Sequence, residues 1–388
     1  MAVGFFEAFV KIWQNCWVEW EKNGPTKTFL TDFMNEVSIY GFISTKDVLL
    51  TLSLGVFFTI LRYLLTVAVF KSFFSWCRLL EKEQKKAPES AFKFLYYSMA
   101  YGYTCYILFN GKYSFFQEPK HCWIGNSTSW HDILCLLSTP GWYKGMPVAQ
   151  DIYVVYVVQA GFYLHSIYAT VFMDQWRRDF ILMILHHILT FALLTFSFAI
   201  RYHRIGLLVL FLHDVCDVFL ELAKLFVAFK TRGGKYCIVS DVLAGINFCI
   251  FTLSWFYCRL YLYPIKVLYS CGSVEARDVL PTAPFYFFFN TMLWCLLVMN
   301  VWWFQYILLL LIRIVLGNSG LEDTREIKKP EMTNGEVFEN GDVSTVNHGM
   351  YNSKDDRKKI DQNFGGLIEK DRKEQFRRRQ PLTKPASP

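Results

Sequence analysis

Seven long apolar runs constrain this chain more than any other feature of its sequence. Each is close to the length that an α-helix needs to cross about 30 Å of hydrocarbon, where only helices and closed barrels satisfy the backbone. Charged residues make up 19% of the 388 residues, against about a quarter in a typical soluble domain. We therefore predict an all-α polytopic membrane protein with about seven transmembrane helices. The runs are 48–70, 92–109, 152–172, 180–200, 205–229, 237–263 and 285–316.

The segments on either side of these runs differ from them in composition. Residues 1–46 precede the first span, which extends over 47–70, and their aromatic residues recur at helical spacing. This pattern predicts an amphipathic helix on the bilayer surface. The aromatic residues are Phe5, Phe6, Phe9, Trp13, Trp17 and Trp20. Residues 317–388 are rich in Lys, Glu, Asp, Asn and Gly, and we expect a disordered tail because so few apolar residues cannot form a core.

Loop charge sets the expected orientation. The connections after the first, third and fifth runs hold more Lys and Arg for their length than the others, and such loops stay in the cytosol. We therefore expect a lumenal N-terminus, a short cytosolic loop at 71–89 and a cytosolic C-terminus. The N-glycosylation sequon at Asn126 falls in a loop that this topology places in the lumen. The same loop holds Cys122 and Cys135, which gives the hypothesis of a lumenal disulfide.

Ionisable residues inside the fourth and fifth runs are the strongest sign of function. The fourth run holds His186 and His187, and the fifth holds His213, Asp214 and Asp217. Each such group costs about 2.5–3.5 kcal/mol at the bilayer centre, so it needs a partner or a role. A short turn makes the two helices antiparallel neighbours, so these groups can converge. We therefore predict a functional site in the cytosolic half of the membrane rather than a set of structural hydrogen bonds.

The chemistry of this cluster favours proton or acyl transfer. A carboxylate orients an imidazole, and His exchanges protons near neutral pH or carries an acyl group as a nucleophile. A di-iron site is the competing interpretation, but the eight histidines include no HxxxH or HxxHH cluster, so we expect no metal. Glu221 and Lys224 are expected to pair one helical turn apart. The net charge of +7 is spread along the chain, which gives no support for nucleic-acid binding.

Longer stretches then give a resemblance to a known family. Residues 172–225 resemble the Lag1 motif of ceramide synthases, and residues 90–316 resemble the wider TLC domain that contains it. The motif stretches are FMDQWRRDF (172–180), HHILT (186–190), RYHRIG (201–206) and LFLHDVCDVFLELAK (210–224), flanked by FYLHSIYAT (162–170) and PFYFFFN (284–290). The resemblance implies transfer of a fatty acyl group from acyl-CoA to the amine of sphinganine or sphingosine in the endoplasmic reticulum membrane, giving (dihydro)ceramide.

The resemblance also assigns residues and partners. The family's paired histidines correspond to His186 and His187, and its two motif aspartates correspond to Asp214 and Asp217. No cofactor is implied, because acyl-CoA is a substrate; membrane lipids and a homo- or heterodimer are the further partners. Many vertebrate members carry a Hox-like insert for which the loop 71–89 is too short. The chain therefore looks most like the stearoyl-CoA-preferring type, also in the segment 266–283, which the family links to acyl length.

Our mechanistic hypothesis makes His186 the acyl acceptor, oriented by Asp214 or Asp217, and makes His187 the group that deprotonates the amine. The reverse assignment of the two histidines stays open. A direct attack on the thioester, with a histidine as general base only, also stays open. The alternative from another class is a non-catalytic TLC-domain protein that binds or senses lipid.

Five further residues have two interpretations each. His165, Tyr168 and His213 are candidates for lining a substrate tunnel, and interhelical hydrogen bonds explain them equally. Arg177 and Arg178 are candidates for steering CoA phosphates, and anchoring on the cytosolic side explains them equally.

Overall fold

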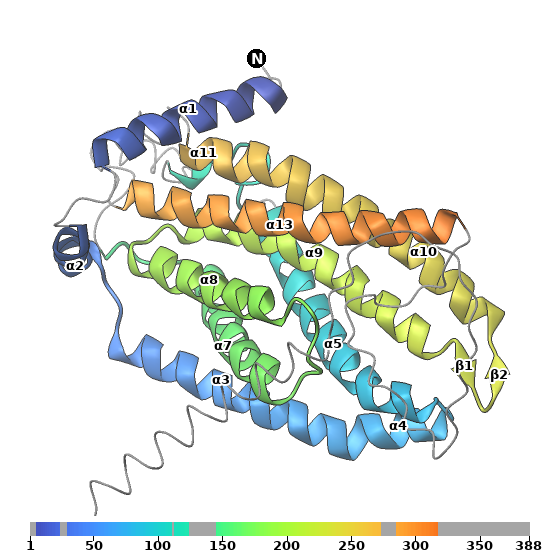
Figure 1. Ribbon diagram of the computed structural model, residues 1–388. Helices are drawn as coiled ribbons and strands as arrows, with labels where there is room; N and C mark the ends of the chain where they lie inside the picture. Colours follow the sequence, from blue (N-terminus) through green and yellow to red (C-terminus); the bar gives the residue numbers. More distant parts are fainter. Residues whose placement is uncertain (1–4, 24–28, 111, 124–144, 273–284, 317–388) are drawn as a thin grey trace, which may run out of the picture. The chain divides into compact units, whose positions relative to one another are not determined.

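The structure, a computed structural model, describes residues 5–23, 29–110, 112–123, 145–272 and 285–316 (Figure 1). The sequon at Asn126, the cysteine Cys135 and the tail 317–388 lie outside these residues. The described part is built almost entirely from helices, which confirms the all-α prediction. The helices are α1 (Phe5–Asn23), α2 (Phe29–Tyr40), α3 (Thr45–Leu65), η1 (Thr66–Phe70), α4 (Lys71–Trp76), α5 (Glu81–Phe109), η2 (Pro119–Cys122), α7 (Gln150–Phe172), α8 (Phe180–Ala199), α9 (His203–Ala228), α10 (Ile238–Ser254), η3 (Trp255–Leu268), α11 (Tyr269–Gly272) and α13 (Tyr286–Val315).

Five helical stretches are long and apolar enough to cross a membrane, counted over the described residues. They are Thr45–Trp76, Gln150–Phe172, Phe180–Ala199, Ile238–Gly272 and Phe288–Ile314. The two remaining predicted runs lie in α5 and α9, which are helical as expected. Both helices carry charged residues that lower their hydropathy. The helix α9 is largely buried, whereas α5 exposes apolar side chains such as Leu95, Met99 and Tyr106 on the outer surface. The chain is therefore a multi-pass membrane protein.

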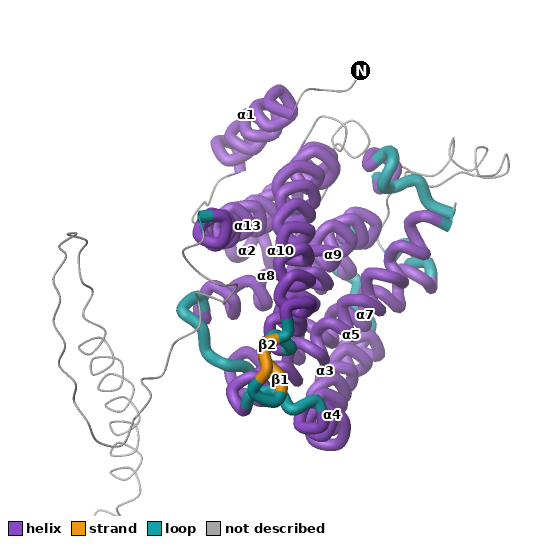
Figure 2. Tube along the Cα trace, turned by 90° about the vertical axis from the view of Figure 1, so that its right-hand side faces the viewer, coloured by secondary structure: helices purple, strands orange, loops and turns teal. Residues whose placement is uncertain are grey.

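The ring of helices around the centre explains why α5 and α9 tolerate their polar residues. Going round the ring, α5 packs on α9, α9 on α10 and η3, η3 on α13, α13 on α8, α8 on α7, and α7 back on α5 (Figures 1 and 2). The helix α3 lies outside this ring and packs on α7. Small residues permit the close approach, because a Cβ added at Gly161 would lie 2.6 Å from Leu54 and one at Gly55 would lie 2.9 Å from Leu164.

The predicted loop at 71–89 differs from the structure. Only residues 77–80 separate α4 from α5, and the rest of the segment is helical. Glu81 and Glu83 occupy the first turn of α5, where acidic residues favour the positive end of the helix dipole. The extra turns carry Glu89 toward the interior of the bundle.

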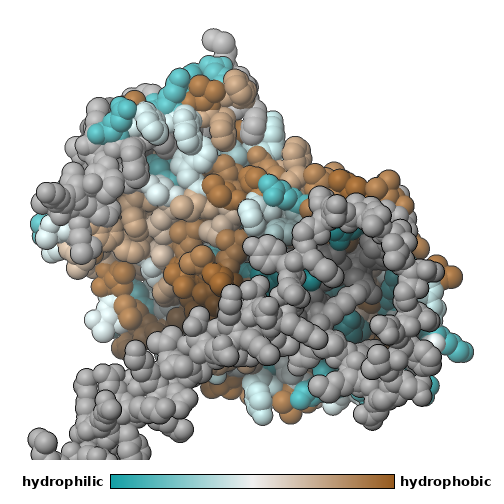
Figure 3. All heavy atoms as spheres, in the orientation of Figure 1, coloured by the Kyte–Doolittle hydropathy of each residue, from teal (hydrophilic) through white to brown (hydrophobic). Residues whose placement is uncertain are grey.

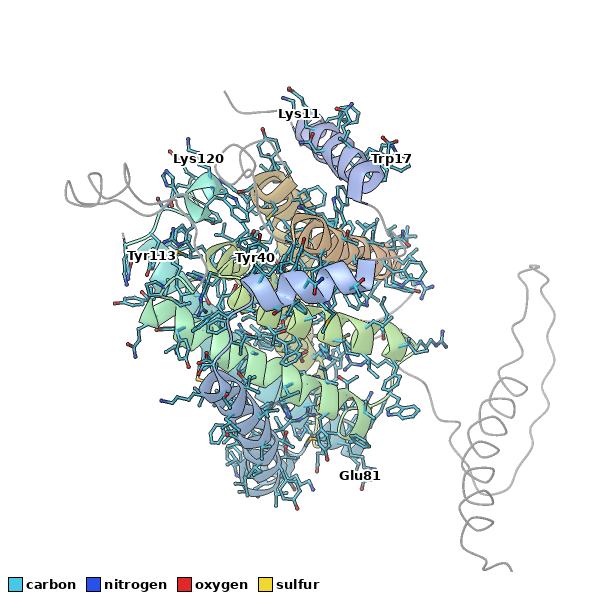
Figure 4. All side chains as sticks on the ribbon, turned by 90° about the vertical axis from the view of Figure 1, so that its left-hand side faces the viewer. Lys11, Trp17, Tyr40, Glu81, Tyr113 and Lys120 are labelled. Atoms are coloured by element: carbon cyan, nitrogen blue, oxygen red, sulfur yellow. The ribbon has the colours of Figure 1, made fainter. Side chains whose placement is uncertain are left out.

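A β-hairpin closes the same end of the bundle. Its strands are β1 (Thr231–Arg232) and β2 (Lys235–Tyr236), joined by Gly233 and Gly234 with φ values of 55° and 76°. Two successive positive φ values define the hairpin turn that glycine favours. We call this end of the bundle the basic end, because the hairpin and the starts of α5 and α8 carry its basic residues. Figure 4 shows Glu81 at this end, opposite Tyr113 and Lys120.

The predicted amphipathic helix at the N-terminus is α1. Its Asn15 side chain donates a hydrogen bond to the Gly272 carbonyl (3.0 Å), and the rings of Phe9 and Trp13 pack edge-on against Trp294. The helix therefore contacts α11 and α13, while Trp17 stays exposed. Its position on the bilayer surface stays a prediction.

The outer surface of α8 and α13 is apolar, as a membrane-spanning bundle requires. Figure 3 shows apolar side chains gathered over these helices on the face seen in Figure 1. Exposed members of this surface are Ile181, Leu185, Ile188, Val298, Trp302 and Leu309. In water such a patch would be costly, but against lipid it is the expected surface.

Candidate active site

Two cavities meet inside the ring of helices. The first, which we call the polar vestibule, opens at the basic end and is lined by charged residues that include Lys86, Glu89, Lys93, Arg177, Glu221 and Lys224. The second, which we call the apolar tunnel, is lined by residues of α8, α9, η3 and α13 that include Thr190, Leu194, Val209, Leu210, Leu293 and Leu296. With their open mouths they hold about 2610 and 880 Å³, respectively.

Three polar side chains line both cavities and so mark their junction. They are His186 on α8, Asp217 on α9 and Arg259 on η3. Among the described histidines, His186 alone lines both cavities. The junction therefore joins a charged space to an apolar space, and His186 is its one imidazole among the described residues.

His186 is held by packing rather than by a carboxylate. Its Nδ1 is buried and has no hydrogen-bond partner among the described residues. Its ring lies edge-on to Trp303, with ring centroids 5.1 Å apart, and 5.8 Å from the ring of His187. Trp303 is itself fixed, because its indole nitrogen donates to Asp179 Oδ2 (3.0 Å). A buried nitrogen without a protein partner is available to a substrate.

Asp217 holds Arg259 instead of a histidine. Arg259 Nη2 donates to Asp217 Oδ1 (2.8 Å) and to the backbone carbonyl of His213 (2.8 Å). The guanidinium lies 4.0 Å above the centroid of Trp255, a cation–π contact that is stronger in a dry site. Arg259 is 3% exposed, so its guanidinium is a buried cation that Asp217 holds in place at the junction.

Asp214 lies elsewhere, although the sequence places both aspartates on one face of the helix. Three residues turn an α-helix by about 300°, so two such side chains diverge by about 60°. Asp214 Oδ2 accepts from Gln159 Nε2 (2.6 Å), and Gln159 Oε1 accepts from Tyr96 (2.9 Å). Asp214 is fully buried and lines neither cavity. Through Gln159 on α7, Asp214 is linked to Tyr96 on α5, and not to an imidazole.

The other histidines of the cluster have distinct places. His187 lines the vestibule, and its Nδ1 lies 3.2 Å from Thr170 Oγ1. His213 lines the tunnel, and its Nδ1 lies 2.7 Å from the Val209 carbonyl, so Nδ1 carries the proton. Its Nε2 then accepts from Asn300 Nδ2 (3.0 Å). With both nitrogens engaged, His213 is a neutral structural imidazole.

The remaining candidates for tunnel and CoA contacts separate clearly. His165 Nδ1 lies 2.9 Å from Thr59 Oγ1 on α3, and Tyr168 is 48% exposed on the outer surface. Neither residue lines the vestibule or the tunnel. Arg177 lines the vestibule, whereas Arg178 is exposed and lines an outer groove between α8 and α13.

An ion-pair network walls the vestibule. Asp174, between α7 and α8, accepts from Arg62 on α3 (2.5 Å) and from Lys93 on α5 (2.7 Å). Lys93 also pairs with Glu89 (2.7 Å), which Arg177 approaches at 3.4 Å. The predicted pair of Lys224 with Glu221 is confirmed, at 2.7 Å. The charges therefore neutralise one another while they tie α3, α5 and the α7–α8 connection together.

The sequence prediction missed Arg259, Gln159, Trp303 and Asn300. Arg259 had a usable signal, because an arginine inside the apolar run 237–263 needs a partner as much as the aspartates do. It lies on the π-helix η3, in which hydrogen bonds join residues five apart. Such helices are rare overall, but those that occur are often at functional sites. Pro264 inside η3 lacks the backbone N–H that a regular helix requires. The amides and the indole gave no comparable signal.

Cys122 is buried and forms no disulfide with another cysteine of the described residues. Its hypothetical partner Cys135 lies outside the described residues. The disulfide therefore stays a hypothesis.

The fold and the site together define a polytopic helical membrane protein with a buried histidine at the junction of two cavities. Comparisons with known proteins identify it further. The TLC domain, described for TRAM, LAG1 and CLN8 proteins, matches residues 86–309. Ceramide synthase 1 of Homo sapiens is 42% identical over 285 residues, which cover 73% of this chain and 77% of that protein.

Two further relatives agree. Ceramide synthase 1 of Mus musculus is 40% identical over 285 residues, 73% of this chain and 77% of that protein. Ceramide synthase LOH1 of Arabidopsis thaliana is 32% identical over 294 residues, 70% of this chain and 87% of that protein. The chain therefore belongs to the TLC-domain family and, within it, to the ceramide synthases. It is an enzyme, so the non-catalytic alternative is not supported.

Proposed function

We propose that this enzyme transfers a long-chain acyl group, stearoyl above all, from acyl-CoA to the amine of sphinganine or sphingosine, with His186 as the acyl acceptor. The observation that carries this proposal is the position of His186, the imidazole that lines both cavities. An acyl thioester has one charged, water-soluble half and one apolar half, and its carbonyl joins them. The vestibule suits the first half and the tunnel suits the second.

The first step is attack on the thioester. The unprotonated imidazole nitrogen of His186 forms a bond to the carbonyl carbon, and the carbon–sulfur bond breaks. The proton on the other nitrogen passes to the sulfur, so CoA leaves as its thiol. The intermediate is an acyl-imidazole with its tail in the tunnel. Negative charge develops on the carbonyl oxygen in this step, and the guanidinium of Arg259 is the fixed positive charge at the junction.

The second step forms the amide. The neutral amine attacks the acyl-imidazole, the bond from carbon to the imidazole nitrogen breaks, and the amine loses its proton. His187 lines the vestibule beside His186, so it takes this proton and returns it to the imidazole of His186, which leaves as the neutral group. The direct route, in which the amine attacks the thioester and a histidine acts only as general base, uses the same residues.

The length of the tunnel supports a long-chain acyl group. The lining residues from His186 to Ser197 on α8, and from Asp217 to Ile205 on α9, extend about 16–18 Å at 1.5 Å per residue. An extended alkyl chain advances about 1.25 Å per carbon at ordinary bond lengths and angles, so this length holds about 14 carbons. Trp123, Tyr202 and Cys271 line the tunnel at its far end. An acyl chain of about 14 carbons or more, which includes stearoyl, therefore reaches this end.

Location follows from the same assignment. We propose that the basic end faces the cytosol, where acyl-CoA is found, and that the protein resides in the endoplasmic reticulum membrane. The basic residues of the vestibule and the hairpin support this orientation. Sphinganine reaches the enzyme from the membrane, and the two substrates are its proposed partners.

The test is an N-acylation assay in membranes that contain the enzyme, sphinganine and acyl-CoAs from C14 to C26. We expect C18 dihydroceramide from the wild type and none above background from His186→Ala. The matched control is His165→Asn, because His165 is a buried histidine that lines neither cavity, and this variant keeps activity. Activity that survives in His186→Ala would contradict the proposal.

A mass spectrum of the denatured enzyme separates the two routes. The covalent route predicts a C18 acyl mass on the peptide that contains His186 after reaction with acyl-CoA alone. Turnover without this mass would favour the direct route.

A further inference from the structure

Glu221 occupies a position in the vestibule that the reaction as described does not use. It lies four residues after Asp217 on α9, which places it about 6 Å along the helix from the junction. Its side chain lines the vestibule, and the residue is only 3% exposed. A carboxylate so deeply buried requires partners for both of its oxygens.

Glu221 has only one such partner. Lys224 Nζ donates to its Oε1 (2.7 Å), whereas Oε2 is buried and has no hydrogen-bond partner among the described residues. Two other acidic residues of the vestibule wall, Glu89 and Asp174, differ in this respect. Glu89 contacts Lys93 and Arg177, and Asp174 contacts Lys93 and Arg62. Lys93 is therefore already engaged with two carboxylates.

An unpaired buried acceptor costs about 1–3 kcal/mol, more when it is charged, unless a ligand supplies the missing donor. The two substrates differ in what they offer at this place. The CoA portion carries phosphates, which a carboxylate repels. The head of a sphingoid base carries an amine and two hydroxyls, all of which donate hydrogen bonds, and its amine must come close to His186.

We propose that Glu221 Oε2 is the recognition site for the amino-diol head of the acyl acceptor, which it holds one helical turn from the acyl carbon. The proposal rests on the proposed function and extends it from the acyl donor to the acceptor. The carboxylate receives hydrogen bonds from the head group and so fixes the amine beside the junction. Glu221 thereby selects amine lipids with polar heads over plain alkylamines.

The experiment measures the two substrates separately in Glu221→Gln. We expect kcat/KM for sphinganine to fall about 10- to 100-fold, which is the loss of one charge-assisted hydrogen bond. We expect kcat/KM for stearoyl-CoA, measured at saturating sphinganine, to stay within about twofold. We also expect the preference for sphinganine over octadecylamine, which lacks the two hydroxyls, to shrink by at least about tenfold, because the site no longer penalises a missing donor.

Two control variants isolate the free oxygen. Lys224→Gln keeps a donor for Oε1 and leaves Oε2 in place. This variant loses kcat/KM for sphinganine to the same extent as Glu221→Gln only if the ion pair, and not Oε2, binds the head group. Asp241→Asn removes a carboxylate that also has a lysine partner, Lys230 at 2.8 Å, but lines neither cavity. Thermal unfolding of each variant in detergent identifies any loss of folded protein.

The outcomes are distinct. A fall in kcat/KM that is specific to sphinganine and limited to Glu221→Gln supports the proposal. Equal falls for both substrates, no change for either, or the same loss in Lys224→Gln overturns it. A wild type that forms no amide at all contradicts the proposed function instead.

Discussion

The vestibule and the tunnel use the same two helices in opposite ways. The half of α8 and α9 nearest the basic end contributes His187, Glu221 and Lys224 to a charged wall. The other half contributes mainly apolar residues such as Leu193, Leu194, Ile205, Val209 and Leu210. Charged side chains of the vestibule form ion pairs with one another. The acidic and basic side chains that line the tunnel are Asp217 and Arg259, at the junction. The two regions meet at a single layer of side chains, formed by His186, Asp217 and Arg259.

Precise side-chain geometry matters more in the vestibule than in the tunnel. An apolar tunnel binds an acyl chain through the apolar area that it buries and through its own length, so exchanges between apolar side chains of similar volume are tolerated. A charged wall is held together by ion pairs, and the loss of one member of a pair leaves the other as an uncompensated buried charge. Substitutions in the vestibule and at the junction therefore act on rate and stability, whereas substitutions in the tunnel act on which acyl chain is used.

The largest effect is expected at the junction, where the two aspartates of the motif can be compared. Asp217→Asn removes the carboxylate that holds Arg259 and lowers dihydroceramide formation by about 10²–10³-fold, because the guanidinium is no longer held in position to stabilise the carbonyl oxygen. Asp214→Asn keeps its hydrogen bond to Gln159 and acts mainly on the temperature of unfolding. Initial rates and thermal unfolding of both variants make the comparison. Equal loss of rate in the two variants would show that the junction is not special.

The next effect is on stability and concerns the vestibule wall. Asp174→Asn leaves Arg62 and Lys93 without their shared carboxylate and destabilises the fold by about 3–5 kcal/mol. Burial alone would raise the pKa of Asp174, but the cations Lys93 and Arg62 outweigh it and hold that pKa below its ordinary value. The stabilisation is therefore fully present above the unfolded carboxyl's pKa of about 4, and it is lost as pH falls through the lower folded pKa.

Unfolding by denaturing detergent at several pH values measures this. The difference between the wild type and Asp174→Asn should be constant from pH 5 to 8 and should narrow only below about pH 4. A difference that varied around neutral pH would mean that Asp174 is not the group responsible.

The tunnel should respond differently, through acyl length. Trp123 donates to Ser270 Oγ (2.8 Å), and its ring lies 5.2 Å from Tyr202, so its indole closes the far end. Trp123→Ala should raise the use of C20 relative to C18 acyl-CoA about tenfold, since each buried methylene contributes about 0.8 kcal/mol. Competition between the two acyl-CoAs measures the ratio. Ser270→Ala keeps the indole and should shift the ratio less, and an unchanged ratio in Trp123→Ala would place the end of the tunnel elsewhere.

The sequence predicts the helices of this protein better than the partners of its polar residues. Apolar runs identify α3, α7, α8, α9, α10 and α13 and the second half of α5, because a backbone inside lipid can satisfy its hydrogen bonds only as a helix or a closed barrel. Spacing along α9 brings Asp214 and Asp217 to one face, but only packing decides that one meets Gln159 and the other Arg259. These partners come from α7 and η3, more than 40 residues away in sequence for both pairs, and local pattern does not encode such contacts. The extension of α5 through 81–91 was missed for the opposite reason, since its charged residues resemble a loop.

The smallest expected effect tests neighbours in sequence that face different regions. Arg177 lines the vestibule beside Glu89, and Arg178 is exposed on the groove between α8 and α13. Arg177→Gln should raise KM for stearoyl-CoA about two- to fivefold, as expected for a partly exposed charge near phosphates, and the increase should fade at high salt. Arg178→Gln should leave KM within about twofold. Equal increases of KM in the two variants would mean that both arginines act only through the positive charge of the basic end. The vestibule would then not be the path of CoA.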